Sequence, residues 1–305
     1  MAATDSRMTT GPMTAVNWGM LLVLGALWGG SFFFARIAVA EIPPLNLVLF
    51  RVAIAAVALH LYLAVAGPSF RLALPMAGSF VVLALLNNII PFSLMFAGQT
   101  ELGAGAASIL NATTPFWTMI LANLLTSDEK LSWNKSIGVV LGITGAAVMI
   151  GPGVLAGLGG PVWAKLALVG TAVSYGFAAI FARKFSRLPP PIIATGQLTA
   201  STVIMIPVVL FTHGPSGLFS ASMDAWAAVI CLALLATAFA YILFFRLIQS
   251  AGATNTSLVT LIVPVSAILL GALFLGERLE LFEMLGMGLI ALGLLTIDGR
   301  LLKRR

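Results

Sequence analysis

Two prolines lie inside long apolar segments of this sequence, where they could open a helix to a polar ligand. Pro115 and Pro264 each remove one helical hydrogen bond and free the carbonyl four residues earlier, that of Asn111 or Thr260. Bare polar backbone in hydrocarbon is tolerated only where protein or a water-filled cavity receives it. We therefore expect both bends to face one central cavity, in which carbonyls and hydroxyls meet an ammonium group and amides meet a carboxylate.

A plainer alternative is that nearby Ser and Thr hydroxyls bond to the freed carbonyls. The matching places of the two bends favour the cavity, because paired broken helices form the substrate sites of many transporters. Other polar and aromatic side chains inside apolar segments complete the candidate set. The predicted substrate-binding residues are Trp28, Asn87, Asn88, Asn111, Thr114, Trp117, Tyr175, Tyr241, Ser257 and Thr260, with helix bends at Pro91, Pro115 and Pro264.

Two pairs in this set, the adjacent amides Asn87 and Asn88 and the matched aromatics Trp28 and Tyr175, can be assigned roles from their positions. The side chains of Asn87 and Asn88 project about 100° apart on a helix. Amides are costly in hydrocarbon unless they are hydrogen-bonded, so we expect one to face the cavity and the other to bond to a neighbouring helix. The sequence leaves open which is which. For Trp28 and Tyr175, core packing is slightly favoured, and a gate or a stacking surface is the alternative that keeps both in the candidate set.

The ionisable side chains do not favour carboxylate-based ion coupling. All ten acidic residues fall in tails, in loops or near the ends of apolar segments, whereas coupled carriers commonly hold a carboxylate at mid-membrane. Glu129 and Glu277 are predicted to cap helix ends on opposite faces, and His60 to pack against neighbours. Arg51 could meet a substrate carboxylate, but we predict that its long side chain reaches the membrane surface or bonds to a helix end.

No catalytic residue, metal site or cofactor is predicted. The single cysteine, Cys231, excludes an internal disulfide and a cysteine-based metal site. A membrane hydrolase or transferase needs a nucleophile–base pair or metal ligands, and two separated histidines without a buried acid do not supply them. We therefore expect a protein that is not an enzyme.

Membrane-spanning helices must position these residues. Hydrophobic residues make up 60% of the 305-residue chain and charged residues 9%, with a mean hydropathy of +1.08. Soluble domains carry about 25% charged residues, and a membrane-spanning helix needs about 20 apolar ones. Spans are expected at 17–38, 45–66, 74–98, 103–126, 136–151, 163–183, 191–212, 225–248, 254–275 and 282–298.

The distribution of basic residues predicts the orientation. Of the 16 Lys and Arg residues, 12 fall on the side that holds both termini. Cytoplasmic loops are rich in Lys and Arg, so both termini are expected in the cytoplasm, which requires an even number of spans. The net charge of +6 has this origin, and no nucleic-acid partner is expected.

The chain also contains an internal repeat. An offset of 147 residues places Trp28 on Tyr175, and one of 149 places Pro115 on Pro264. Each copy holds an odd number of spans, so the second enters from the opposite side. The predicted fold is an all-α membrane protein of ten transmembrane helices, arranged as two inverted five-helix repeats around a central cavity. The expected divisions are an N-terminal cytoplasmic tail (1–16), a first repeat (17–151), a linker (152–162), a second repeat (163–298) and a basic cytoplasmic tail (299–305).

Short motifs recur in the same order in both copies. The first copy has Leu27–Trp28–Gly29–Gly30–Ser31, Arg51, Gly103–Ala104, Thr114–Pro115 and Asp128–Glu129–Lys130–Leu131, and the second has Gly252–Ala253, Val263–Pro264 and Gly276–Glu277–Arg278–Leu279. This set resembles paired EamA domains of the drug/metabolite transporter superfamily. The resemblance covers residues 17–298 and implies an exporter similar to bacterial inner-membrane amino-acid exporters. Arg51 departs from the duplication, because Gln197, Leu198 and Thr199 stand at the matching place.

The leading prediction is an amino-acid exporter of the inner (plasma) membrane, acting by alternating access as a facilitator. Alternatives are a proton-coupled exporter of drugs or other metabolites, and a nucleotide-sugar or phosphometabolite exchanger. A phosphate site would need several Lys or Arg, and mid-membrane positions offer Arg51 alone. The expected partners are a zwitterionic substrate and the lipid bilayer. The chain is expected to be a monomer or homodimer, with the helix that carries Gly138 and Gly142 at the periphery.

Overall fold

The computed structural model describes residues 13–102, 104–150, 161–214, 220–275 and 281–298. Every regular element in these ranges is a helix, and none of them contains a strand. The all-α prediction is therefore confirmed over the described residues. Predictions that concern residues 1–12 of the N-terminal tail, 151–160 of the linker, the motif at 276–280 with Glu277, and the basic tail at 299–305 lie outside them.

Six described helical stretches are long and apolar enough to cross a membrane: Ala15–Val39, Pro44–Ala66, Phe70–Glu101, Val162–Phe185, Pro190–Thr212 and Met223–Ala251. Their outer surfaces carry apolar side chains such as Val65 (87% exposed) and Phe211 (90% exposed). Large exposed apolar surfaces mark contact with lipid or with other proteins. The other predicted spans are shorter or interrupted helices, so a total of ten stays a prediction.

The helices follow the order expected of two repeats. The first repeat contains α1 (Ala15–Val39), α2 (Pro44–Ala66), α3 (Ala77–Ala84), α4 (Ile90–Glu101), α5 (Ala104–Asn111), α6 (Thr114–Leu125) and α7 (Trp133–Ile150). The second contains α9 (Val162–Ala182), α10 (Pro190–His213), α11 (Met223–Ala233), α12 (Ala240–Ala251), α13 (Ala253–Ser257), α14 (Val259–Leu275) and α15 (Leu281–Asp298). Two π-helical segments, Leu85–Ile89 and Leu234–Phe239, join α3 to α4 and α11 to α12.

Local sequence explains where several of these helices begin. α2 and α10 start at Pro44 and Pro190, because proline has the φ of a first turn and lacks an N–H that the first turn does not need. α1 and α11 follow Thr14 and Ser222, whose hydroxyls accept hydrogen bonds from backbone N–H groups in the first turn.

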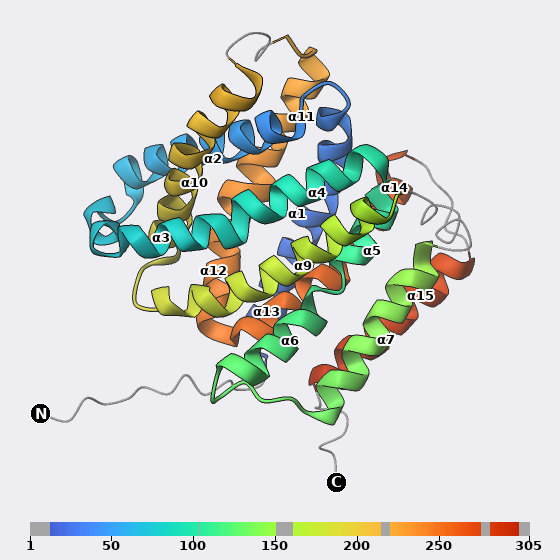
Figure 1. Ribbon diagram of the computed structural model, residues 1–305. Helices are drawn as coiled ribbons and strands as arrows, with labels where there is room; N and C mark the ends of the chain where they lie inside the picture. Colours follow the sequence, from blue (N-terminus) through green and yellow to red (C-terminus); the bar gives the residue numbers. More distant parts are fainter. Residues whose placement is uncertain (1–12, 103, 151–160, 215–219, 276–280, 299–305) are drawn as a thin grey trace, which may run out of the picture.

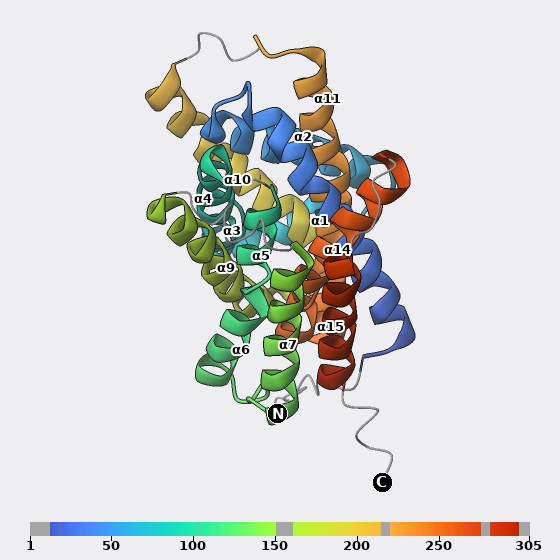
Figure 2. The same ribbon diagram turned by 90° about the vertical axis from the view of Figure 1, so that its right-hand side faces the viewer.

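The two repeats interlock instead of forming separate bundles. Their helices, coloured blue to green and yellow to red, alternate across the molecule (Figures 1 and 2). α1 packs against α11, α12 and α14 of the second repeat, and its counterpart α9 packs against α4, α5 and α6 of the first. α2 packs against its own counterpart, α10. The two halves therefore share one core.

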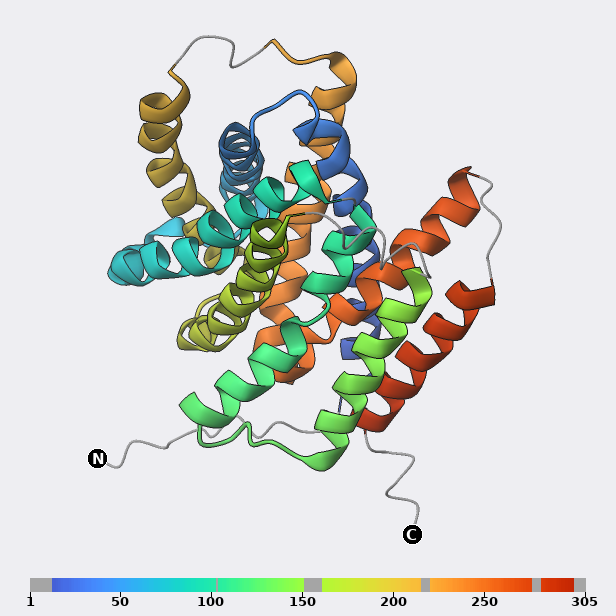
Figure 3. The same cartoon turned by 45° about the vertical axis from the view of Figure 1, so that its right-hand side comes forward.

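The last helices of the repeats, α7 and α15, lie side by side at one edge of the molecule (Figure 3). A Cβ atom on Gly138 would lie 2.6 Å from the carbonyl oxygen of Gly293, and one on Gly145 would lie 2.8 Å from that of Gly286. Only glycine permits such close backbone approach. Higher numbers in α7 meet lower numbers in α15, so these counterpart helices run antiparallel, as inverted repeats require.

The fourth span of each repeat is interrupted, which corrects the predicted bends. α5 ends at Asn111 and α6 begins at Thr114, so Pro115 lies in the first turn of a new helix, where its missing N–H costs little. In the second repeat the break falls at Leu258, between α13 and α14, and Pro264 lies inside α14. Pro91 likewise lies in the first turn of α4.

Candidate functional site

A cavity of about 50 Å³ lies where the two repeats meet. Residues of both repeats line it, from α1 in the first repeat to α14 in the second. Eight of the ten side chains predicted to bind substrate are among them: Trp28, Asn87, Asn111, Thr114, Tyr175, Tyr241, Ser257 and Thr260. The interrupted fourth spans of both repeats thus face a common space.

The adjacent amides Asn87 and Asn88 take different positions. Asn87 lines the cavity, and its Nδ2 donates to Gln197 Oε1 (3.0 Å). Asn88 is fully buried away from the cavity; its Nδ2 donates to Ser201 Oγ (2.8 Å), and its Oδ1 accepts from the Tyr241 hydroxyl (2.6 Å). Asn88 therefore connects the third helix of the first repeat to α10 and α12.

The π-helical segment Leu85–Ile89 presents backbone carbonyls to neighbouring helices. Pro91 has no N–H, so the carbonyl of Asn87 loses its usual helical partner. The Tyr241 hydroxyl donates to this carbonyl (3.2 Å), and Ser174 Oγ donates to that of Leu86 (2.7 Å). π-bulges are frequent at functional sites, and here the exposed carbonyls hold a side chain that lines the cavity.

The second repeat has a matching π-helical segment, Leu234–Phe239, at an offset of 149 residues. Its Ala236 carbonyl accepts hydrogen bonds from Trp28 Nε1 (3.1 Å) and Arg51 Nη2 (3.3 Å). The Thr237 hydroxyl donates to the Leu232 carbonyl (2.7 Å) and accepts from Arg51 Nε (2.7 Å). Each π-helical segment therefore positions a cavity-lining aromatic side chain from the other repeat.

Arg51 lies in the cavity wall, and the prediction that its side chain reaches the membrane surface is wrong. The residue is 3% exposed and lines the cavity, with Cζ 3.9 Å from the centre of the Phe92 ring. It lies seven residues beyond Pro44, about 10 Å along the helix axis. The sequence did contain a signal for this position, because an ionisable residue this deep in a membrane helix is a candidate functional residue.

The rest of the lining is mainly apolar, and sequence reasoning did not find it. It consists of Ser31, Phe32, Phe92, Met95, Ala179, Phe244 and Val259. Such residues recur throughout the chain, so type and spacing do not distinguish them. Among the described residues that line the cavity there is no Asp or Glu, and Arg51 is the single formally charged side chain.

The interrupted helices contribute hydroxyl and amide groups. Thr114 Oγ1 donates to the Asn111 carbonyl (2.6 Å), and Thr260 Oγ1 donates to the Ser257 carbonyl (2.9 Å). The Asn111 carbonyl therefore accepts a hydrogen bond from a hydroxyl, as the plainer alternative predicts, and keeps a second lone pair. Its side-chain Oδ1, in contrast, is buried without a hydrogen-bond partner. Trp117, beyond this break, does not line the cavity.

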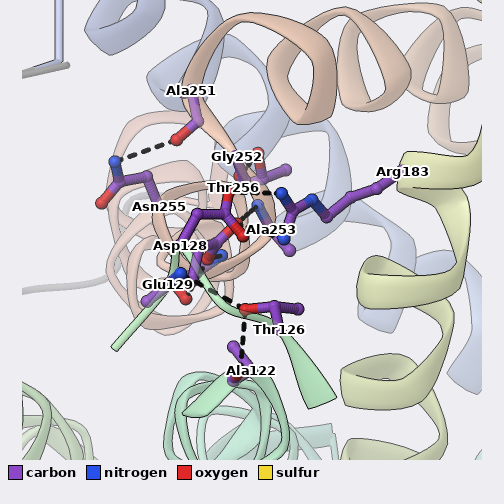
Figure 4. A network of polar contacts seen from close by, with 11 residues as sticks. Ala122, Thr126, Asp128, Glu129, Arg183, Ala251, Gly252, Ala253, Asn255 and Thr256 are labelled. Atoms are coloured by element: carbon purple, nitrogen blue, oxygen red, sulfur yellow. Dashed lines mark hydrogen bonds and ion pairs between the residues drawn. The ribbon is translucent and has the colours of Figure 1, made fainter. Parts of the chain in front are cut away.

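A second polar cluster lies at the start of α13 (Figure 4). Glu129, from the loop between α6 and α7, is 3% exposed and accepts hydrogen bonds from the backbone N–H groups of Ala253 (3.0 Å) and Thr254 (2.8 Å) and from the Thr254 hydroxyl. Arg183 Nη1 lies 3.5 Å from Glu129 Oε1, and its Nη2 lies 2.5 Å from Asp128 Oδ2. Burial acts to raise the pKa of Asp128, but the hydrogen bond and charge of Arg183 hold it below its usual value. Glu129 caps α13, as predicted.

Comparison with known families decides the identity of the fold. Residues 17–151 and 162–297 each match the EamA-like transporter family. The chain belongs to this family. The EamA-like repeats correspond to the two sets of helices that interlock around the cavity, and the protein is a membrane transporter.

Several EamA-like relatives align over nearly the whole chain. The chain is 26% identical to the uncharacterized inner membrane transporter YedA of Escherichia coli K12 over 283 residues, which cover 92% of this chain and 90% of YedA. It is 24% identical to the uncharacterized transporter YoaV of Bacillus subtilis over 284 residues, covering 92% and 96%. A solved crystal structure with 18% sequence identity superposes with a TM-score of 0.75, covering 95% of this chain and 98% of that one. This structural likeness concerns the fold alone.

Proposed function

We propose that this EamA-like transporter exports amino acids or similar zwitterions across the bacterial inner membrane, by alternating access through the central cavity. The observation that carries the proposal is that matched residues of the two repeats meet there: Trp28 with Tyr175, and Asn111 with Thr260. A site shared by two inverted copies can be presented to either face of the membrane by the same structural plan.

The composition of the cavity wall supports a substrate with an apolar body and polar ends. Trp28, Phe92, Met95 and Phe244 form an apolar surface, whereas Asn111 and its neighbours supply amide and hydroxyl groups. Small-molecule sites commonly combine such apolar walls with a few polar groups that fix orientation. Threonine, methionine and aromatic amino acids have this character.

The size of the cavity supports a mechanism with more than one conformation. Its volume of about 50 Å³ accommodates a few water molecules, whereas sites for small molecules typically enclose about 300–1,000 Å³. Helices must therefore move apart before an amino acid can enter. We propose that this movement opens the cavity to one face of the membrane at a time, with both termini in the cytoplasm.

Charge in the cavity supports facilitated export and argues against a phosphorylated substrate. Coupled carriers commonly use an intramembrane carboxylate, and the described lining contains none. A phosphate group is usually held by several cationic side chains, whereas the described lining offers Arg51 alone.

A flux experiment tests the proposal. Purified protein in liposomes is loaded with labelled amino acids, with nucleotide sugars and cationic drugs as separate arms, and efflux is followed with and without a pH gradient. We expect efflux of threonine, methionine or aromatic amino acids that depends little on the gradient. Absence of flux for every amino acid would remove this substrate class, and a steep gradient dependence would remove the facilitator mechanism.

A matched pair of asparagine variants tests the site. Asn111 and Asn46 are both 5% exposed and both carry a buried Oδ1 without a hydrogen-bond partner, but only Asn111 lines the cavity. We expect Asn111→Ala to weaken transport and Asn46→Ala to leave it near the wild-type rate. Equal rates in two well-folded variants would exclude Asn111 from the site.

A further inference from the structure

The guanidinium group of Arg51 is held on two sides and left unpaired on the third. Nε donates to Thr237 Oγ1 and Nη2 to the Ala236 carbonyl, while Nη1 is buried without a hydrogen-bond partner. Its Cζ lies over the Phe92 ring, 3.9 Å from the ring centre. A guanidinium has five N–H donors in a fixed fork, so both N–H groups of Nη1 remain unpaired in a side chain that lines the cavity.

Among the described residues, no carboxylate pairs with the charge of Arg51. Its hydrogen-bond partners are a hydroxyl and a carbonyl, and the ion pairs found in the described part of the chain all involve Arg183. A buried charge without a counter-ion is strongly unfavourable. An anionic group that enters the cavity and accepts hydrogen bonds from Nη1 would relieve this cost, and a neutral group of the same size would not.

The same cavity offers an unpaired acceptor. Asn111 Oδ1 is buried, has no partner and belongs to the lining, as Arg51 does. We infer that Arg51 Nη1 binds the carboxylate of the transported substrate and that Asn111 Oδ1 accepts a hydrogen bond from its ammonium group. This inference rests on the proposed function and deepens it, because it makes a free carboxylate the feature that the transporter recognises. It assigns the Asn111 amide to the ammonium group, whereas amides were first expected to meet the carboxylate.

A purely structural role for Arg51 makes a different prediction. In that case the residue only joins α2 to the π-helical segment Leu234–Phe239, and loss of the join affects all ligands equally. Thr237→Val removes the 2.7 Å bond to Arg51 Nε but keeps the cation and Nη1. Arg36→Gln removes another arginine that donates to a backbone carbonyl, that of Gln99 (2.8 Å), outside the cavity lining. Arg36→Gln is the control, and Thr237→Val measures the contribution of the join between α2 and the π-helical segment.

The decisive measurement compares acids with their carboxamides. Binding of L-methionine, L-phenylalanine and L-threonine, and of their carboxamides, is measured on purified protein in detergent by calorimetry. The wild type is expected to prefer the acid. Arg51→Gln is expected to weaken acid binding about 10- to 100-fold, the usual range for one hydrogen bond to a charged group, with carboxamide binding unchanged. Arg51→Lys should retain part of the preference, because it keeps the charge but not the fork. Arg36→Gln should retain it fully, and Thr237→Val, which removes one of the two groups that hold the guanidinium, should retain part of it.

Several results would overturn the inference. Equal wild-type affinity for acid and carboxamide would do so without any variant, so a failure of Arg51→Gln to fold does not leave the question open. Equal weakening of both ligands in a folded Arg51→Gln protein would assign the residue a structural role. An effect of chloride that removes the acid preference would assign Nη1 to an inorganic anion. If the wild type carries no amino acid, the proposed function fails separately, and binding of 3-phenylpropanoate then tests Arg51 alone.

Discussion

Replacing Glu129 by Gln should open one end of the cavity. The Glu129 carboxylate ties the α6–α7 loop to the first residues of α13 through two backbone N–H groups and the Thr254 hydroxyl (Figure 4). Ser257, which lines the cavity, lies four residues beyond Ala253, about 6 Å along the helix. A change that releases the start of α13 should therefore alter the position of Ser257, about one helical turn away, and with it the cavity wall.

The size of the effect follows from the lost bonds. Each hydrogen bond to a charged group contributes about 1.5–3 kcal/mol. Gln keeps one carbonyl acceptor but turns an NH₂ group toward backbone N–H donors, so at least one such bond is lost together with the negative charge at a helix N-terminus. We expect a loss of about 2–4 kcal/mol from the conformation in which this contact is formed. An equilibrium between closed and open ends would shift by roughly 30- to 1,000-fold.

Cysteine labelling measures the shift. In a Cys231→Ser background, Ser257→Cys reports access to the cavity by a water-soluble maleimide, and adding Glu129→Gln should raise the labelling rate. Asp128→Asn is the control, because the Asp128–Arg183 pair is partly exposed, with side-chain exposures of 30% and 18%, and such pairs contribute about 0–1 kcal/mol. Equal labelling and equal thermal stability of the two variants would refute the reasoning.

Three further predictions concern stability in detergent. Tyr241→Phe removes the single O–H that the Asn87 carbonyl and Asn88 Oδ1 share and should cost about 1–3 kcal/mol; an unchanged melting temperature would contradict this. Gly138→Ala should lower the melting temperature by forcing α7 from α15, whereas Gly288→Ala, whose Cβ would meet no atom within 4 Å, should not; a similar fall in both would show that the close approach is unimportant. The depressed pKa of Asp128 means that its pair with Arg183 adds stability above the ordinary carboxyl pKa of about 4 and loses it as the pH falls through the lower folded value. The acid-induced decline in melting temperature should therefore be shallower in Asp128→Asn, and identical declines would count against the pair.

Much of the fold could be predicted because hydrocarbon restricts the backbone so strongly. Long apolar segments in a membrane must be helices, and the offset of about 147–149 residues indicated the duplication. Paired prolines marked the two spans that are interrupted, but the breaks themselves precede the prolines, after Asn111 and at Leu258. These signals depend on local chemistry, which the sequence contains directly.

The cavity was only partly predictable because its chemistry depends on directions that tertiary packing decides. Arg51 could extend to the surface or turn inward, and only the packing of α2 on the second repeat selects the inward course. Pro91, just after the first π-helical segment, indicated a freed carbonyl there. No proline follows the second segment, so the sequence gives no sign that Ala236 and Thr237 act as acceptors. Which of Asn87 and Asn88 faces the cavity likewise depends on how their helix is rotated about its axis, and packing decides that rotation.

The exchange of helices between the repeats limits how this transporter can change shape. α1 packs among α11, α12 and α14, and α9 packs among α4, α5 and α6. A rigid-body movement of either repeat would therefore break the contacts of its first helix with the other repeat. The moving bodies must be mixed groups that each take helices from both copies. A cut in the connection between the copies should accordingly leave two fragments that fold only in each other's presence.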